Sequence, residues 1–474
     1  MSTHTPTPLI PPAQIERNFR EIAPALTAAE ALFEAHRCLY CFDAPCMHAC
    51  PTHIDVPAFI KKIATGNLTG SARVIFDANP IGATCARVCP VEVLCEGACV
   101  EKTLLQKPIE IGRLQRHATD SALGRGRDAF KAGPPNGKSV GVVGSGPAGL
   151  SCAAYLARLG YAVTVYERRP LAGGLDTYGM AEYKMTQRVS QEEVAHVARL
   201  GVEIKTGAEI GRDLSPDDLL ARHDALFLGV GLGPTRRLDI PGEDLAGVYD
   251  ALDFIERIKT RDWASVPLGR TVAVVGAGNT AIDAVTQARR LGAERVLLLY
   301  RRTQREMSAY EYEFELAKQD AVEFWWQTAP VAVLADAAGE RAAALRCVRT
   351  ELSEPDEAGR RSAVVIEGSE FEIPVDLIIK ATGQEKLRDW LSKTAGVETD
   401  SSGRVVVHKE TMQTSNPKIF AGGDCVNGGR EAVDAAQMGK LAAQGIHLQL
   451  TGESVEFAGA RVTLPESTGQ IHAA

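Results

Sequence analysis

The chain has 474 residues, of which 45% are hydrophobic and 24% charged, and its 52 Lys and Arg against 60 Asp and Glu give a net charge of −8. This length suits about three domains, and the acidic balance argues against a nucleic-acid binder that relies on charge. No apolar run reaches the ~18 residues that a membrane span needs, and the Pro-rich start MSTHTPTPLIPP has no secretory signal pattern. We therefore expect a cytoplasmic protein that binds neither membrane nor nucleic acid.

Cysteine is concentrated near the N-terminus. Eight of the eleven cysteines lie between Cys38 and Cys99, among stretches that look helical and show no alternating strand pattern. In a reducing cytosol such clustering favours metal ligation over disulfides. We expect residues 1–135 to form a helical metal-binding domain that ends in the Gly- and Pro-rich linker GRGRDAFKAGPPNGK.

The spacing of these cysteines favours iron–sulfur clusters over zinc. Cys38 begins a C-x2-C-x4-C-x3-C-P run and Cys89 begins a C-P-x4-C-x3-C run, whereas a zinc site would show two close pairs across one longer spacer. In two-cluster ferredoxins the Cys before the Pro ligates the other cluster, so Cys50 should leave its run and Cys99 should return to it. The expected sets are Cys38, Cys41, Cys46 and Cys99 for one cluster, and Cys50, Cys89, Cys95 and a further ligand for the other. Counting alone would make Cys85 that ligand.

A βαβ unit begins at Ser139 with the run SVGVVGSGPAGL. Its glycines allow a tight turn at a helix N-terminus, which suits a pyrophosphate, and the acid that closes the next strand suits ribose hydroxyls. The alternative, a chance glycine turn, is disfavoured by the strand–turn–helix context. The expected contacts are Gly144, Gly146, Pro147, Ala148, Gly149 and Glu167.

A second βαβ unit begins 132 residues later, at TVAVVGAGNTAID. An Arg at the end of its second strand can meet the 2′-phosphate of NADP, although a solvated basic turn is the alternative. Two nucleotide folds imply two nucleotides, and a flavin with a nicotinamide is the economical pair. The expected contacts are Gly276, Gly278, Asn279, Thr280, Ala281, Arg301 and Arg302.

Three short motifs indicate that the first fold binds the flavin. They resemble the GG, ATG and GD motifs of two-dinucleotide-domain flavoproteins, in which the GD aspartate contacts the ribityl-phosphate region of FAD. They contain Gly174, Leu175, Thr382, Gly383, Gly423 and Asp424. No Cys-x4-Cys pair follows the first fingerprint, which disfavours a disulfide reductase. We expect a multidomain chain: the helical iron–sulfur domain, then an α/β flavoprotein with an FAD domain in two parts (136–250 and 380–474) around an inserted NAD(P) domain (251–379).

The Cys-rich region resembles a known family. The runs HRCLYCFDAPCMHACPTHIDVPAFI, IFDANPIGATCARVCPVEVLCEGAC and IEIGRLQRHATD are similar to the electron-input half of dihydropyrimidine dehydrogenase, and the nucleotide folds extend the match over residues 30–450. Bacteria often carry this half as a separate flavin subunit. The small subunit of glutamate synthase is a relative, but it usually has a shorter spacing where this chain has Cys89 and Cys95.

The resemblance implies an electron-transfer chain. NAD(P)H would reduce FAD, and two [4Fe–4S] clusters would pass electrons to a partner subunit that holds FMN and iron–sulfur centres and reduces uracil or thymine, in a hetero-oligomer such as a heterotetramer. A glutamine completes the second cluster in this family, which makes Gln115 the expected ligand in place of Cys85. Bacterial members with a similar YRR segment use NADH, so we expect NADH, with NADPH possible. The loop YGMAEYK departs from the family at Ala181 and Glu182.

Two other functions remain open. A glutamate-synthase-type or ferredoxin-linked NAD(P)H oxidoreductase subunit would have the same parts. A redox sensor or assembly scaffold would hold flavin and clusters without rapid turnover. Because hydride transfer needs orientation more than acid–base groups, we assign no catalytic side chain.

Overall fold

The computed structural model describes residues 9–126, 128–260, 263, 266–356, 359, 361–391, 393, 394, 396–458, 460 and 461. The chain divides into two compact units. The larger contains residues 22–177, 184–233 and those described from 386 to 461, and the smaller contains 9–21, 178–183 and those described from 234 to 385. The predicted domains extend at both ends into residues 1–8 and 462–474, which lie outside the described ones.

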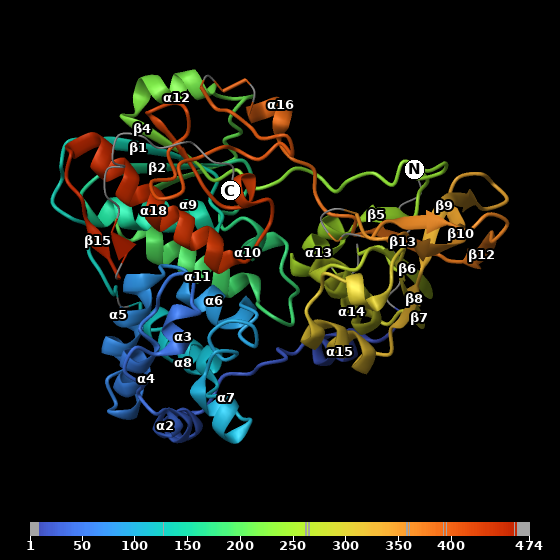
Figure 1. Cartoon of the computed structure of the whole chain (residues 1–474), viewed down its shortest axis with the longest axis horizontal. Coiled ribbons are helices and arrows are strands. Elements are labelled where there is room, and N and C mark those ends of the chain that lie inside the picture. The colour runs from blue at the N-terminus through green and yellow to red at the C-terminus, as the bar shows by residue number, and fades with distance from the viewer. Residues whose placement is uncertain are drawn as a thin grey trace. The chain divides into compact units, whose positions relative to one another are not determined.

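The larger unit begins with a helical, Cys-rich layer. Helix α2 (Ala28–Arg37) starts at a capping box, in which Thr27 accepts from the amide of Glu30 while Glu30 accepts from the amide of Thr27. The other helices are α3 (Pro45–His48), α4 (Val56–Ala64), α5 (Leu68–Ala78), α6 (Gly82–Val88), α7 (Val100–Leu105) and α8 (Ile111–Leu123). Helix α8 packs against α4, α5 and α6, and Figure 1 shows the layer as the dark to light blue helices.

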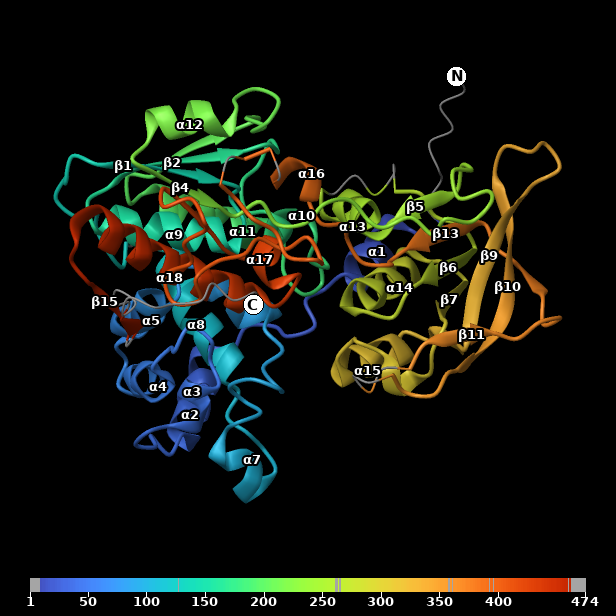
Figure 2. The ribbon, with the colours of Figure 1, turned by 45° about the horizontal axis from the view of Figure 1, so that its top comes forward.

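A parallel sheet follows in the same unit. Its strands are β1 (Ser139–Val143), β2 (Ala162–Glu167), β3 (Glu203–Thr206), β4 (Ala225–Leu228) and β14 (Ile419–Ala421), in the order β14-β4-β1-β2-β3. All four pairings are parallel, and strand β4 is buried throughout, as a strand covered on both faces requires. Figure 2 shows α9 (Pro147–Arg158), α11 (Gln187–Ala198) and α18 (Ala432–Thr451) on one side of the sheet and α12 (Pro216–Arg222) on the other.

Short elements complete the larger unit. They are α10 (Leu175–Tyr178), α16 (Arg388–Leu391), α17 (Asp424–Asn427), β15 (Glu456–Phe457) and β16 (Ala460–Arg461). One buried hydrophobic cluster joins the two layers: it runs from Phe59 and Ile75 in the helical layer to Phe227 and Phe420 in the sheet. The Cys-rich layer and the first nucleotide fold therefore share one core.

The smaller unit holds a second parallel sheet. Strands β5 (Val248–Asp250), β6 (Thr271–Val275), β7 (Arg295–Tyr300), β8 (Glu323–Trp326) and β13 (Leu377–Lys380) lie in the order β5-β13-β6-β7-β8. Helices α1 (Pro12–Asn18), α13 (Ala251–Lys259), α14 (Asn279–Leu291), η2 (Gln304–Glu306) and α15 (Glu311–Gln319) belong to this unit. An antiparallel sheet of β9 (Thr328–Ala335), β10 (Ala342–Leu352), β11 (Ala363–Val365) and β12 (Phe371–Pro374) was absent from the sequence prediction.

The predicted fold class is confirmed. A helical N-terminal layer precedes two parallel α/β sheets, and the second sheet is inserted in the sequence between β4 and β14 of the first. Among the described residues, no helix is long and apolar enough to cross a bilayer.

Candidate redox and nucleotide sites

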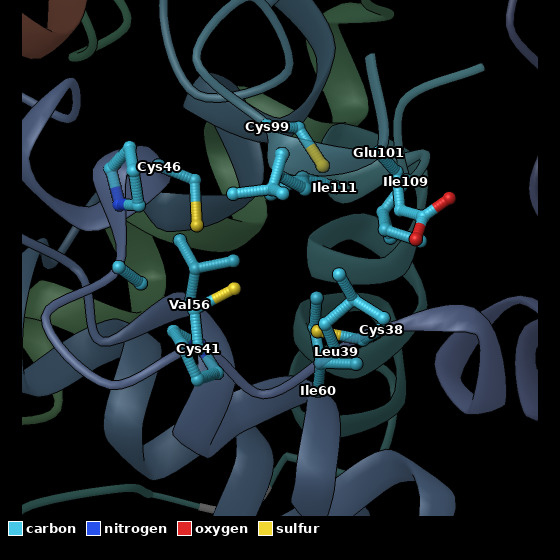
Figure 3. A pocket seen from close by; sticks show the side chains of 14 residues that line it. Cys38, Leu39, Cys41, Cys46, Val56, Ile60, Cys99, Glu101, Ile109 and Ile111 are labelled. Carbon is cyan, nitrogen blue, oxygen red and sulfur yellow. The ribbon is translucent and has the colours of Figure 1, made fainter. Parts of the chain in front are cut away.

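Four of the predicted cluster ligands surround one pocket in the helical layer. Cys38 follows the end of α2, Cys46 lies in α3, and Cys99 immediately precedes α7. These three thiols and that of Cys41 line the pocket, and Figure 3 shows their sulfur atoms around a hollow. Apolar residues complete the wall, among them Val56, Ile60, Ile109 and Ile111. The structure thus brings together the set that the ferredoxin rule predicted for the first cluster.

The donor chemistry of this pocket fits a [4Fe–4S] cluster. Burial raises the pKa of the Cys46 thiol to about 12, and the nearby thiols of Cys99 and Cys38 contribute in the same direction. Neighbouring thiolates repel one another, so all four can ionise together only around a strongly positive centre, which an iron core provides. A zinc ion would need its sulfurs to converge at about 2.3 Å from one point. Instead the four sulfurs stand around a hollow, and no three His, Cys, Asp or Glu among the described residues are placed to share one ion.

The thiols of the second predicted set are also neighbours. Cys89 caps the end of α6, and its pKa is raised by a hydrogen bond with Cys85, by burial, and by the thiols of Cys85, Cys50 and Cys95. Burial also raises the pKa of Cys95, and the charge on Cys50 adds to this effect. Cys50, Cys85, Cys89 and Cys95 therefore form a second group, and Cys95 also lies near Cys46 of the first pocket.

Of the two candidates for the eighth ligand, Cys85 lies on helix α6 and Gln115, on α8, contacts the start of α6. The Gln115 side chain is 7% exposed, and its amide nitrogen donates to the carbonyl of Gly82 at 2.7 Å. No hydrogen bond to its amide oxygen is present among the described residues, so that oxygen is available to ligate iron. Cys85 lies one turn further along α6, and its sulfur accepts a hydrogen bond from the side-chain amide of Asn79 at 3.1 Å. The choice of Gln115 over Cys85 stays a prediction.

A residue of the flavin-binding fold holds α6 in place. The carboxylate of Glu193, on α11, accepts from the amide of Ala83 at 2.7 Å, from the amide of Thr84 at 3.1 Å, and from the Thr84 hydroxyl. Burial raises the pKa of Glu193 to about 7, although these hydrogen bonds oppose the rise. Glu193 was not predicted as a functional residue, because nothing near it in the sequence signals a partner 110 positions away.

The first fingerprint and two of the three predicted flavin motifs, GG and GD, meet at the start of α9. A Cβ on Gly149 would lie 2.0 Å from the carbonyl oxygen of Gly144, and a Cβ on Gly174 would lie 2.7 Å from the Cα of Gly146. Only glycine allows approaches this close. A Cβ on Gly423 would lie 3.1 Å from that of Ala148, so the GD motif also reaches this turn. The predicted contacts of the larger unit that gather here are Gly144, Gly146, Pro147, Ala148, Gly149, Gly174, Leu175, Gly423 and Asp424.

The two predicted acids differ in their surroundings. Glu167, at the end of β2, accepts from the amide and hydroxyl of Ser145 and from the amide of Arg169 at 2.8 Å. It therefore fixes the glycine turn, whether or not it also meets a ribose. Asp424 begins α17 and accepts from the amide of Arg430 at 3.3 Å. Burial raises the pKa of Asp424, although the hydrogen bond from Arg430 and the charge of Lys386 oppose the rise.

The second fingerprint opens α14 in the smaller unit. Asn279 accepts from the amide of Tyr310 at 3.1 Å, so its side chain connects the turn to the segment after η2. Arg301, directly after β7, is exposed, and Arg302 is half-buried. Gly276, Gly278, Thr280 and Ala281 lie at the same turn or in the first turn of α14. Thr382 and Gly383, predicted as flavin contacts, also belong to the smaller unit, where the Thr382 hydroxyl donates to the carbonyl of Arg236 at 2.7 Å.

These features define a two-dinucleotide-domain flavoprotein with an N-terminal iron–sulfur domain. Residues 15–127 match the family model described as dihydropyrimidine dehydrogenase domain II, 4Fe-4S cluster, and residues 138–439 match the model described as pyridine nucleotide-disulphide oxidoreductase. The chain belongs to the pyridine nucleotide-disulphide oxidoreductase family. It is an NAD(P)H-linked iron–sulfur flavoprotein oxidoreductase.

Individual relatives agree with this assignment. The glutamate synthase [NADPH] small chain of Escherichia coli K12 is 38% identical over 444 residues, which cover 90% of this chain and 93% of that one. The NADP(+)-dependent formate dehydrogenase subunit beta of Moorella thermoacetica is 34% identical over 429 residues, covering 85% of this chain and 59% of that one. Among solved structures, Mycobacterium tuberculosis FprA in complex with NADPH superposes with a TM-score of 0.54 at 19% identity, over 68% of this chain and 85% of that one. That likeness shows the fold alone.

Proposed function

We propose that the chain is the electron-input subunit of a dihydropyrimidine dehydrogenase. NADH gives a hydride to FAD, and the two electrons leave singly through two [4Fe–4S] clusters to a partner subunit that carries FMN and iron–sulfur centres. There uracil or thymine gains two electrons and two protons and becomes the 5,6-dihydro form. The observation that supports this most is the grouping of seven cysteines into two sets. The five residues between Cys89 and Cys95 and the family model over residues 15–127 favour the pyrimidine enzyme.

The ligand assignment is part of the proposal. Cys38, Cys41, Cys46 and Cys99 hold the first cluster, and Cys50, Cys89, Cys95 and Gln115 hold the second. Because the helical layer and the flavin-binding fold share one core, both sets keep a fixed position relative to the glycine turn of the flavin. Electron transfer weakens steeply with distance, so a rigid layer of this kind serves the reaction.

The chain itself contributes binding and orientation. FAD, when bound, accepts a hydride and releases electrons one at a time. The turn from Gly144 to Gly149 binds its pyrophosphate, Glu167 holds that turn through Ser145, and Asp424 faces the ribityl-phosphate region. The turn from Gly276 to Ala281 binds the pyrophosphate of the nicotinamide coenzyme. No side chain needs to move a proton in the hydride step.

A glutamate-synthase-type subunit is the second candidate. It is favoured by the 38% identity to the Escherichia coli small chain over nearly the full length of both proteins. The relatives described above are named for NADPH or NADP(+), and Arg301 and Arg302 suit a 2′-phosphate, which makes NADPH the alternative coenzyme.

The test is to isolate the native complex anaerobically and identify the partner. A partner with FMN, and NADH oxidation that depends on uracil and on both chains, would support the proposal. NADPH oxidation that depends on glutamine and 2-oxoglutarate would establish the second candidate instead. If the isolated chain oxidises NADH with uracil as fast as the complex, the two-subunit reading is wrong. Absence of rapid dye reduction by the isolated chain would favour a sensor or scaffold.

A further inference from the structure

A fully buried lysine lies between the flavin-binding fold and the Cys-rich layer. Lys440, on α18, has an exposed fraction of 0%, and its ammonium donates to the carbonyl of Thr52 at 2.8 Å and to that of Ala78 at 3.1 Å. Among the described residues no carboxylate lies within ion-pair distance of it. The nearby Asp77 is already paired with Arg158, at 2.6 Å. A buried cation without an anionic partner is strongly unfavourable, so this position needs an explanation.

An ionised Cys50 is the leading negative charge that acts on Lys440, ahead of Asp77. Thr52 follows Cys50 by two residues, and the Cys50 thiol lies 3.4 Å from the Thr52 hydroxyl. Burial lowers the pKa of Lys440 to about 8, whereas an ionised Cys50 opposes that effect. The charge of Lys440 in turn helps burial to lower the pKa of His53, in the same turn. Lys440 therefore acts electrostatically on the loop that carries a proposed ligand of the second cluster.

The same lysine adjoins the flavin turn. A Cβ on Gly439, its neighbour in α18, would lie 2.2 Å from the carbonyl oxygen of Ala148, a predicted flavin contact. Helix α18 thus contacts the start of α9 at Gly439 and the cluster layer at Lys440. Figures 1 and 2 both show α18 beside α9.

We propose that Lys440 is the charge that raises the reduction potential of the cluster held by Cys50, and that it orients the loop of Cys50 through the Thr52 carbonyl. This inference rests on the proposed function. Reduction of that cluster adds one electron, supplied by the reduced flavin, and transfers no atom. The extra negative charge is then stabilised by the ammonium of Lys440 in a medium that screens it poorly. Lys440 is a positioning residue: it touches neither coenzyme nor substrate.

The experiment is a redox titration of the anaerobic holoenzyme followed by EPR, with iron and FAD measured on each sample. Lys440→Gln keeps a hydrogen-bond donor and removes the charge, Lys440→Met removes both, and Lys440→Arg keeps the charge. At the potential where half of the Cys50-linked cluster is reduced in the wild type, the ratio of reduced to oxidised cluster should fall about tenfold in the Gln and Met variants. A tenfold change equals about 59 mV for one electron. The Arg variant should stay close to the wild type.

Two controls identify the affected cluster. The cluster whose reduction potential changes must be the one that Cys50→Ser alters. The reduction potential of the other cluster must stay the same. Lys418→Met removes an exposed lysine directly before β14 and should change neither cluster's reduction potential, because water screens that charge. If Lys440→Gln loses four irons while Lys440→Arg keeps them, the charge of Lys440 is needed to hold that cluster, which also supports the proposal.

The inference is overturned if Lys440→Gln keeps the wild-type potential, or if Gln and Arg shift it equally, since a packing role predicts the latter. These results are distinct from failure of the proposed function. If wild-type protein holds no second cluster, or if its partner is not a pyrimidine-reducing subunit, the proposed function fails before any variant is compared.

Discussion

The imidazole of His196 packs against the ring of Phe76, with ring centroids 4.7 Å apart. His196 lies on α11 of the flavin-binding fold and Phe76 lies on α5 of the Cys-rich layer, so the pair is part of the joint between the two layers. The side chain is 4% exposed, and burial, aided by the charge of Arg199, lowers the pKa of His196 to about 4. This joint therefore requires a neutral imidazole.

The first prediction is that acid weakens this joint. The folded-state pKa lies below the ordinary value of 6.5, so the stabilisation is complete above pH 6.5 and is lost as the pH falls towards 4. At pH 5 the loss from this group should be about 2 kcal/mol in the free energy of unfolding. His196→Phe keeps a ring against Phe76 and should reduce the difference between pH 7 and pH 5 by that amount, measured by denaturant unfolding.

An exposed histidine serves as the control for this prediction. His36→Gln, on α2, should leave the pH dependence of unfolding as it is in the wild type. If His196→Phe and the wild type lose stability equally between pH 7 and pH 5, His196 does not link acid to the joint.

Local sequence was enough for the parts that a turn or a spacing defines. The spacing of Gly144, Gly146 and Gly149 predicts a tight turn with close backbone approach, and the contact between Gly149 and the Gly144 carbonyl is such an approach. The ferredoxin rule moved Cys99 to the first set, and Cys99 lines the first pocket. Patterns of this kind can be recognised in a sequence because the chemistry restricts residues that are close together along the chain.

Contacts between the Cys-rich layer and the flavin-binding fold could not be predicted from the sequence. Glu193 meets Ala83 across 110 positions and Lys440 meets Thr52 across 388, and neither residue stands in a local pattern that differs from an ordinary helix. Strand β10 was missed for another reason. Its pairing with β9 contains two register shifts, so its buried positions do not alternate regularly along the sequence.

The second prediction concerns cofactor content. Anaerobically purified protein should contain one FAD and about eight iron atoms per chain, because two four-iron clusters are expected. Cys46→Ser should lower iron to about four atoms by emptying the first pocket. Cys347→Ser, at a buried cysteine of β10 in the smaller unit, should leave the iron content unchanged. Zinc in place of iron by metal analysis would disprove the cluster assignment.

The third prediction concerns coenzyme choice. We expect higher kcat/KM with NADH than with NADPH in steady-state dye reduction. Arg301 is exposed at the end of β7, and Arg301→Glu would place a carboxylate where a 2′-phosphate would lie. That repulsion should lower the ratio of kcat/KM for NADPH to that for NADH by about tenfold, or 1.4 kcal/mol.

The coenzyme preference of the wild type can itself contradict this prediction. A wild type that prefers NADPH, with the preference abolished by Arg301→Glu, would show that Arg301 selects the phosphate and would disprove the NADH expectation. Arg295→Glu, on the same strand, is the control, because Arg295 is paired with Glu323 at 2.8 Å. It should leave the ratio unchanged.

The fourth prediction is that Gln115, not Cys85, completes the second cluster. An amide oxygen is a neutral donor, so it makes the cluster less negative than a fourth thiolate would. Cys85→Ser should therefore keep about eight irons and both EPR signals, because Cys85 would be only a packed thiol that accepts from Asn79. Gln115→Leu should perturb or empty the cluster at Cys50, Cys89 and Cys95 and spare the one in the first pocket. Gln115→Glu, which keeps an oxygen ligand and adds a negative charge, should retain the irons and lower the reduction potential of that cluster.

The assignment is wrong if Cys85→Ser loses four irons while Gln115→Leu leaves the iron content and both EPR signals unchanged. In that case the second cluster is held by four cysteines, and the Gln115 amide serves only to hold the carbonyl of Gly82 at 2.7 Å.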